Sequence, residues 1–323
     1  MSTILVTGGL GFIGSNFISQ ILKSDHFIVN IDSKTYASID SLYLQFESHS
    51  NYKYYNIDIN NFDEVNKIIS NYTFDKIFHF AAESHVDNSI NDPFLFAKTN
   101  VIGTLNLLES YKNLNKENKL FIHVSTDEVF GSIEEEKFNE LSPYLPNSPY
   151  SASKASSDHF VRSYFITYKL PIIITNCSNN YGRFQNKEKF IPTIIKSLIE
   201  RKKIPVYGKG NNIREWIFVE DHVSALIHLS KNGQIGESYC VGSDNEFSNI
   251  NIVKKICKIF DELTEYQDSE DLISFVEDRK GHDFRYAVNS NKIEMTGWSC
   301  EFDFEESLKK TVKWYLNNKN FLN

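Results

Sequence analysis

Two short groups of residues in this 323-residue chain carry side chains suited to acid–base chemistry. Tyr150 and Lys154 stand four positions apart, and residues at this spacing share one face of a helix. A cation beside a phenol favours the ionised form, so the pair predicts a tyrosine that acts as a base at neutral pH. Upstream, Thr126, Asp127 and Glu128 follow an apolar run that predicts a buried strand. Adjacent carboxyl groups at a strand's exit supply an acid and a base, which favours chemistry beyond simple oxidation, such as elimination of water.

Short apolar runs and helical patterns alternate up to about residue 180 and would position these groups. The predicted strands are Ile4–Val6, Phe27–Ile31, Lys76–Phe80, Leu120–Val124 and Ile172–Ile174, with helices at Phe94–Leu108 and Ser151–Tyr168 among the segments between them. Such alternation is typical of βαβ units. We therefore expect an α/β fold, a Rossmann-type doubly wound parallel sheet covered by helices on both faces.

The pattern loosens after residue 180, where Pro and Gly separate shorter elements. Helical patterns recur at residues 191–199, 223–229 and 250–260. We expect a nucleotide-binding domain over residues 1–180 and a smaller α+β substrate-binding lobe over residues 181–323, with some crossing of the chain between them.

A glycine-rich loop follows the first predicted strand and opens a helix. Gly8 permits the tight turn, Gly11 lets the backbone approach a pyrophosphate, and Gly14 lets the helix and strand pack closely. The free N–H groups of the helix N-terminus would then face the phosphates. An ordinary strand-to-helix turn is the alternative. The acidic residue Asp32 at the end of the next strand favours dinucleotide binding.

Asp32 also bears on which dinucleotide binds. Its carboxylate would accept hydrogen bonds from the ribose hydroxyls and repel a 2′-phosphate, which favours NAD over NADP. Lys34 nearby weakens this preference slightly. Asp58 and Ile59, at the end of the third strand, are placed to meet the adenine, although either could equally be a loop residue.

Composition excludes several classes of protein. The formal net charge of −8 argues against non-specific nucleic-acid binding, which depends on cations that neutralise phosphates. The four cysteines are scattered, so neither a disulfide framework nor a metal site is expected, and a reducing cytoplasm is the natural compartment. The first strand begins almost at Met1, and we expect no signal peptide and no membrane span.

With these motifs in view, the chain resembles the extended short-chain dehydrogenase/reductase family, and within it the dTDP-glucose 4,6-dehydratases. The resemblance runs nearly end to end. Its carriers are Phe80–Asp87, Thr126–Glu128, Tyr150 with Lys154, Asn176–Gly182, Arg214–His222 and Asp278–Asp283. The Thr-Asp-Glu triplet is the discriminating element, because the related 4-epimerases differ there.

The resemblance implies a mechanism. Tyr150 takes the proton of the C4 hydroxyl while NAD accepts the hydride, with Lys154 lowering the pKa of the tyrosine and Thr126 bonding the C4 oxygen. Glu128 removes the C5 proton, and a protonated Asp127 donates to the departing C6 hydroxyl. The hydride returns to C6, which gives a 4-keto-6-deoxy sugar and leaves NAD tightly bound and recycled.

The resemblance also assigns binding residues. Those expected for NAD are Gly8, Gly11, Phe12, Ile13, Gly14, Asp32, Lys34, Thr35, Asp58, Ile59, Phe80, Ala81, Ala82, Ser84, Thr99, Tyr150, Lys154 and Asn180. Those expected for the nucleotide sugar are Ser84, Thr126, Asn179, Lys189, Phe190, Pro205, Tyr207, Arg214, Asn249, Arg279 and His282. Singly, Lys189 and Asn249 could as well be surface residues, and His85 is expected in the core or behind the site.

Three departures from the family pattern bear on specificity. Arg183 and Lys280 stand where the family usually has proline, beside substrate-contacting segments, and Phe130 replaces a tyrosine. UDP-glucose and UDP-N-acetylglucosamine dehydratases therefore stay open as alternatives, as do, less strongly, a 4-epimerase and a non-catalytic NAD-binding regulator. The implied context is deoxysugar biosynthesis, such as that of rhamnose, by a homodimer whose helices at 94–108 and 151–168 pair in a four-helix bundle.

Overall fold

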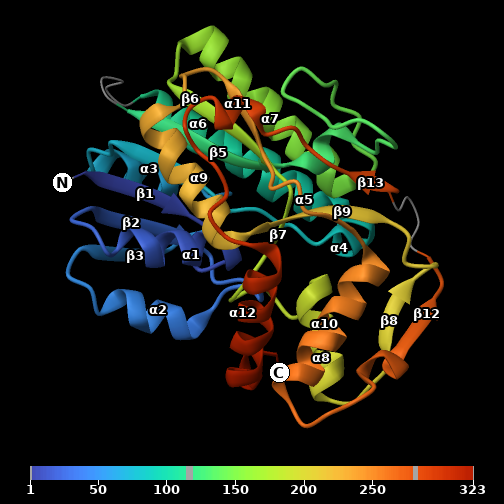
Figure 1. The fold of residues 1–323 in the computed structure, drawn as a ribbon. Helices are drawn as coiled ribbons and strands as arrows, with labels where there is room; N and C mark the ends of the chain where they lie inside the picture. The colour runs from blue at the N-terminus through green and yellow to red at the C-terminus, as the bar shows by residue number, and fades with distance from the viewer. Residues whose placement is uncertain (1, 114–118, 279–282, 323) are drawn as a thin grey trace.

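Seven parallel strands form the main sheet of the protein. The computed structural model describes residues 2–113, 119–278 and 283–322. The strands are β1 (Thr3–Thr7), β2 (Phe27–Asp32), β3 (Tyr52–Asn56), β4 (Lys76–His79), β5 (Leu120–Thr126), β6 (Ile172–Cys177) and β10 (Ser238–Val241). Their order is β10-β6-β5-β4-β1-β2-β3 (Figure 1). The five strands predicted from the sequence all lie in this sheet, so the prediction of a doubly wound parallel sheet is confirmed.

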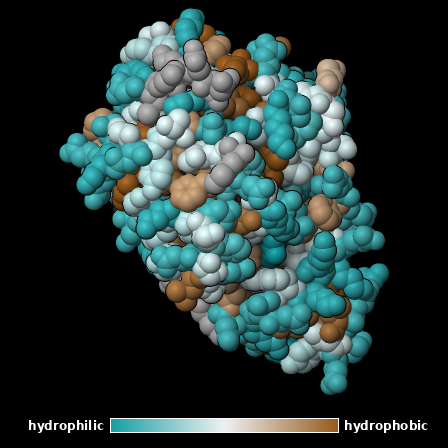
Figure 2. All heavy atoms as spheres, turned by 90° about the vertical axis from the view of Figure 1, so that its left-hand side faces the viewer, coloured by the Kyte–Doolittle hydropathy of each residue, from teal (hydrophilic) through white to brown (hydrophobic). Residues whose placement is uncertain are grey.

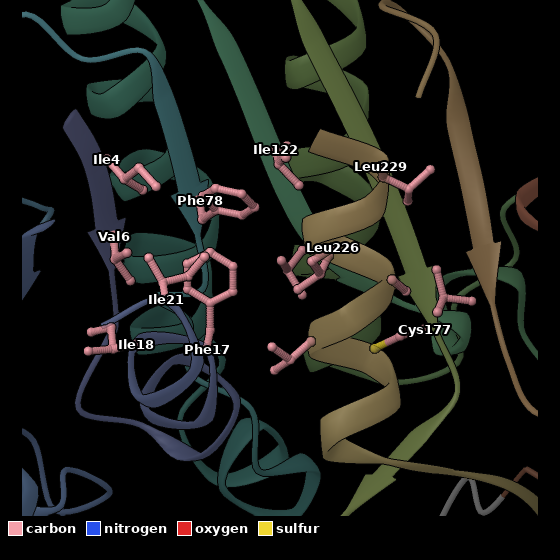
Figure 3. Close-up of a cluster of buried hydrophobic side chains, with 14 of the residues drawn as sticks. Ile4, Val6, Phe17, Ile18, Ile21, Phe78, Ile122, Cys177, Leu226 and Leu229 are labelled. Carbon is pink, nitrogen blue, oxygen red and sulfur yellow. The ribbon is translucent and has the colours of Figure 1, made fainter. Parts of the chain in front are cut away.

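Helices cover both faces of this sheet. One face carries α1 (Phe12–Ile21), α2 (Asp40–Glu47) and α9 (Val219–Asn232), and the other carries α3 (Phe62–Asn71), α6 (Thr104–Lys112) and α7 (Pro149–Tyr168). On the first face, Phe17 of α1 and Leu226 of α9 pack against Phe78 of the sheet (Figure 3). The strands read as continuous apolar runs because both of their faces are buried.

The helix predicted at Phe94–Leu108 is not one regular helix. After α4 (Val86–Asn91), the chain forms α5 (Pro93–Phe96), a π-helical stretch at Ala97–Gly103, and then α6. A π-helical stretch shifts the phase of the side chains that follow it. Asn100 within it is buried, and its amide nitrogen donates to the Glu83 carbonyl (3.0 Å) and to the Ser153 hydroxyl (2.8 Å).

The later part of the chain builds a smaller lobe beside the carboxyl edge of the sheet. Its strands are β7 (Asn179–Tyr181), β8 (Ile204–Tyr207), β9 (Ile213–Phe218), β11 (Glu246–Ser248), β12 (Ile273–Val276) and β13 (Arg285–Tyr286), and its main helices are α8 (Phe190–Ile199), α10 (Asn249–Leu263) and α12 (Phe304–Asn317). An apolar cluster joins these helices to β8 and β9. The lobe lies at the lower right of Figure 1. A shorter helix, α11 (Asn291–Glu294), packs near β10.

The chain crosses between the two parts more than once. β10 follows β9 and α9 in sequence but pairs with β6, and α9 covers the main sheet. The division of the chain into two domains at residue 180 stays a prediction. β10 and α9 follow residue 180 in sequence but pack with the first part.

The surface is mostly polar on the face at the left of Figure 1, and its hydrophobic residues occur in small groups (Figure 2). Within the described ranges, no helix combines the length and the apolarity that a membrane span requires. Those residues also contain no cluster of three or more potential metal ligands.

Candidate active site

The predicted chemistry gathers at the carboxyl edge of the main sheet. The order of strands reverses between β1 and β4, and open α/β sheets bind ligands at such a switch point. A cavity of about 270 Å³, here called the glycine-loop cavity, lies there. The residues predicted for NAD that line it are Gly8, Gly11, Phe12, Ile13, Gly14, Phe80, Ala82, Ser84, Tyr150, Lys154 and Asn180.

The glycine loop has the geometry that a dinucleotide needs. Gly8 has φ +72°, and a Cβ there would lie 2.6 Å from the Ala81 nitrogen. A Cβ on Gly14 would lie 2.3 Å from the Gly8 oxygen, so helix α1 can pack on the loop only with glycine at this position. On Gly11 a Cβ would meet no atom closer than 3.4 Å, and this residue caps α1 without a side-chain hydrogen bond. The start of α1 lines the cavity, so its free N–H groups can face a pyrophosphate there.

Asp32 organises the loop that follows β2. Its Oδ2 accepts a hydrogen bond from the Leu10 nitrogen (2.9 Å), and its Oδ1 accepts from the Lys34 nitrogen (3.0 Å) and the Ser38 hydroxyl (3.1 Å). Burial raises the pKa of this carboxyl group, although these hydrogen bonds oppose the rise. The ammonium group of Lys34 lies over the Tyr43 ring, 3.7 Å from its centroid. The Tyr43 ring thus helps to hold this cation in place.

Several residues predicted for NAD do not line the glycine-loop cavity. They are Asp32, Lys34, Thr35, Asp58, Ile59, Ala81 and Thr99. Ile59 is buried and packs closely on the π-helical stretch at Ala97–Gly103. A Cβ at Gly103 would lie 2.5 Å from the Cδ1 atom of Ile59. Asp58 accepts hydrogen bonds from the backbone and side chain of Asn60. Adenine contacts by Asp58 and Ile59 therefore stay a prediction.

Tyr150 and Lys154 lie in the first turns of α7. The helix begins there because Ser148 and Ser151 form a capping box and Pro149 occupies the first turn. Both functional side chains are buried, and the Lys154 ammonium donates to the Val124 carbonyl of β5 at 2.9 Å.

The electrostatics of this pair differ from the sequence prediction. Burial, followed by the charge of Glu128, raises the pKa of Tyr150 well above its ordinary value, and a hydrogen bond with Thr126 opposes the rise. Burial lowers the pKa of Lys154, while the Asp158 carboxylate opposes the change. Burial of the phenol thus acts against the effect expected of a neighbouring cation, and the role of Tyr150 as a base at neutral pH stays a prediction.

The Thr126–Glu128 triplet follows β5 as predicted. Thr126 ends the strand, and its hydroxyl accepts a hydrogen bond from the Glu128 nitrogen (3.3 Å) and donates to Oδ1 of Asp127 (3.2 Å). A short 3₁₀ helix begins at Asp127 and turns successive side chains in different directions. Thr126 and Glu128 line the glycine-loop cavity, whereas Asp127 does not.

Asp127 is almost fully enclosed. Its side chain is 1% exposed, and its Oδ2 atom has no hydrogen-bond partner among the residues that the structure describes. Burial first, then the charges of Glu128 and Glu215, raise the pKa of Asp127 well above its usual range. These surroundings favour the protonated form of the carboxyl group, the form that a proton donor requires.

A second cavity of about 280 Å³, here called the lobe cavity, adjoins the first. Substrate residues predicted from the sequence that line it are Asn179, Lys189, Phe190, Pro205, Tyr207, Arg214 and Asn249. The predicted Ser84 and Thr126 line the glycine-loop cavity instead, while Arg279 and His282 lie outside the described residues, as does Lys280. Glu128 and Asn179 line both cavities, so Glu128 stands where the two meet.

Arg214 lies inside β9. Its guanidinium donates to the carbonyls of Ile213 (2.7 Å) and Asp283 (3.0 Å), and it lies over the Tyr286 ring at 4.3 Å from the centroid. Flat packing on an aromatic ring and bonds from two nitrogens fix the plane of the guanidinium at the lobe cavity.

We expect Arg214→Ala to raise KM much more than it lowers kcat. Hydrogen bonds to a charged group contribute about 1.5–3 kcal/mol, which corresponds to roughly a 10- to 150-fold rise in KM. Arg214→Lys should recover only part, because an ammonium lacks the planar fork. Steady-state kinetics and binding of the nucleoside diphosphate alone provide the measurement. Wild-type affinity of the alanine variant for that diphosphate would show that Arg214 has only its structural contacts.

The structure adds residues to the site that sequence reasoning missed. Ala37, Gln185, Asn186, Glu188, Trp216 and Tyr286 line one or both cavities. The polar run between β7 and α8, at the carboxyl edge of the sheet, is the signal that predicts three of them. His85 is also at the site and not in the core, because it caps α4 and lines the lobe cavity.

Arg183 does not reach the site. Its Nε donates to the Asn16 side chain at 2.9 Å, and it lines a separate cavity of about 650 Å³ together with Glu220. An influence of Arg183 on the accepted base or sugar is therefore not supported. Another cavity, of about 830 Å³, is lined by Tyr36 and Trp314 among others and by none of the predicted catalytic residues.

A Rossmann-type sheet with a glycine loop at its switch point and a buried Tyr-x-x-x-Lys pair defines a short-chain dehydrogenase/reductase. Comparisons with known proteins narrow this class. A family model described as GDP-mannose 4,6 dehydratase matches residues 5–311. The chain belongs to this family of nucleotide-sugar 4,6-dehydratases.

Individual relatives agree with the family. A dTDP-glucose 4,6-dehydratase of Haemophilus influenzae is 45% identical, with 99% of each chain covered. A solved structure of dTDP-glucose 4,6-dehydratase from Bacillus anthracis in complex with NAD is 40% identical, with a TM-score of 0.89 and coverage of 99% of this chain and 98% of that one. Another, from Streptomyces venezuelae with NAD bound, is 37% identical, with a TM-score of 0.92 over 99% and 98% of the chains.

Proposed function

We propose that this protein is an NAD-dependent dTDP-glucose 4,6-dehydratase that converts dTDP-glucose to dTDP-4-keto-6-deoxyglucose. The observation that carries the proposal is the position of Glu128 at the junction of the two cavities, next to an Asp127 whose burial raises the pKa of its carboxyl group. A base and an acid next to each other suit the removal of water from neighbouring carbons. The relatives of that name and their structures with NAD support the proposal.

Each side chain then has a role. NAD⁺, which the glycine loop would hold, would accept the C4 hydride and later return it to C6, while C5 regains a proton from Glu128. Tyr150 takes the proton of the C4 hydroxyl, which Thr126 holds by a hydrogen bond, and Lys154 keeps a positive charge behind the tyrosine. Glu128 takes the C5 proton. Asp127 gives its proton to the departing C6 hydroxyl.

The lobe cavity would bind the nucleotide part of the substrate. Lys189 and Arg214 bring positive charge to a chain whose formal net charge is −8. The aromatic rings of Phe190 and Trp216 stack at 6.1 Å between centroids with 22° between their planes. An apolar wall and two cations suit a base and a diphosphate, respectively.

A panel of dTDP- and UDP-hexoses tests the proposal. The product from dTDP-glucose should show a C6 methyl doublet in proton NMR and an ultraviolet absorbance in alkali from its 4-keto group. A 4-epimerase would instead produce the C4 epimer without a methyl group, and a non-catalytic regulator would leave every sugar unchanged. Preference for UDP-glucose or UDP-N-acetylglucosamine in the panel would correct the proposed substrate.

We further infer finer properties that follow from this function. The reaction is that of a hydro-lyase in deoxysugar synthesis, such as that of rhamnose, in the cytoplasm. A homodimer would form through a four-helix bundle. Phe94 (83% exposed), Ile102 and Phe160 are exposed apolar side chains on the helices expected to pair, which supports this arrangement.

A further inference from the structure

Two segments that are distant in sequence flank the outer side of the glycine-loop cavity. Ala37, in the loop between β2 and α2, lines the cavity beside Gly8 and Gly11. Glu188 and Lys189, in the segment between β7 and α8, also line it. Both segments therefore form part of the wall that would enclose a dinucleotide.

One hydrogen bond joins the two segments. The Tyr36 hydroxyl donates to Oε1 of Glu188 at 3.0 Å, across 152 positions of sequence. The Asn88 amide nitrogen, from α4, donates to the same hydroxyl at 3.3 Å. Nearby, the Lys189 ammonium donates to the Ser84 carbonyl at 2.7 Å, which fastens the second segment to the loop after β4. We call Tyr36, Asn88 and Glu188 the clasp.

Two hydrogen bonds of the Tyr36 hydroxyl stabilise the clasp. Tyr36 both donates to a carboxylate and accepts from an amide, so its hydroxyl is satisfied on both sides. Burial first, then the Glu188 carboxylate, raise the pKa of Tyr36, so the phenol keeps its proton throughout the neutral range. The ring itself is 59% exposed and packs little, so its hydroxyl group makes its main contribution.

We propose that the clasp holds the cofactor in the protein between turnovers. The inference rests on the proposed function, in which NAD is reduced and reoxidised within one site and need not leave. Tyr36 and Asn88 line neither cavity, so they act as positioning residues that keep the two outer segments together. Release of the dinucleotide requires the Tyr36–Glu188 bond to open.

Tyr36→Phe removes one oxygen atom and tests the clasp without disturbing the core. Wild-type protein loaded with NADH should release it slowly when chased with excess NAD⁺, as followed by nicotinamide fluorescence. The variant should release it roughly three- to tenfold faster, the effect of one net hydrogen bond, while kcat at saturating NAD⁺ stays the same. Glu188→Gln keeps an acceptor for the phenol and should fall between the two.

The chain supplies a matched control. Tyr43 donates to Oε1 of Glu47 at 2.7 Å, which is another exposed tyrosine–glutamate pair, but one within α2 and away from the cavity. Tyr43→Phe should release NADH at the wild-type rate. Equal rates in wild type and Tyr36→Phe, or equal acceleration by both phenylalanine variants, would overturn the clasp and leave the proposed function intact. A wild-type protein that neither purifies with NAD nor binds it would overturn the proposed function itself.

Discussion

Replacing Glu128 with glutamine should stop exchange of the C5 proton while oxidation at C4 continues. The carboxylate lines both cavities and is the proposed base, whereas an amide has no comparable basicity. General base catalysis typically contributes 10²–10⁴-fold, so overall turnover should fall by about that factor. Deuterium incorporation at C5 from heavy water measures the exchange, and the absorbance of reduced nicotinamide should accumulate after substrate is added.

The same substitution should also move the pH dependence of the oxidation step. The charge of Glu128 raises the pKa of Tyr150, so a neutral residue lowers that pKa and the tyrosinate forms at lower pH. The rate of nicotinamide reduction should then reach its plateau at lower pH than in the wild type. Glu83→Gln is the control, since burial raises the pKa of that carboxyl too but it lines neither cavity. Normal C5 exchange in Glu128→Gln would show that another residue takes the C5 proton.

Asp127→Asn should block loss of the C6 hydroxyl and preserve the earlier steps. Because burial raises the pKa of Asp127 and so favours its neutral form, an amide of the same shape disturbs the local charge little but cannot deliver the acid proton. We expect dehydration to slow by about 10²-fold or more. C5 exchange should persist in part, which distinguishes this variant from Glu128→Gln in the same heavy-water experiment.

Asp127 has an alternative role that the experiment separates. It lines neither cavity, and Thr126 donates to its Oδ1 atom, so the carboxyl group could simply support the turn after β5. In that case Asp127→Asn would lower C4 oxidation, C5 exchange and dehydration by one common factor. The ratio of the three rates decides between a proton donor and a support for Thr126.

The sequence was sufficient for five of the seven strands of the main sheet, because these are largely buried on both faces and read as apolar runs. Ile172–Ile174 and Leu120–Val124 are examples, and both fall within strands of the structure. No range was predicted for β3, which is partly exposed, or for the short strand β10. The phase change at residues 97–103 could not be predicted, since a π-helical stretch depends on tertiary contacts such as those of Asn100.

The sequence predicted which residue types form the site better than it predicted the directions of their pKa shifts. The spacing of Tyr150 and Lys154 places both on α7, but spacing does not reveal that Lys154 donates to the Val124 carbonyl or that both groups are desolvated. Likewise, adjacency of Asp127 and Glu128 does not reveal which of them faces a cavity. Burial is a property of the whole fold, and it determines these pKa directions.

The place of β10 in the sheet affects the order in which the protein can fold. β10 pairs with β6 only after the chain has passed through β7, α8, β8, β9 and α9. Until residue 241 has been synthesised, β6 is an edge strand whose residues, all buried in the finished protein, face solvent. Exposed apolar edges invite pairing between chains. The nascent chain therefore carries an unpaired strand edge while most of the substrate lobe is still being made.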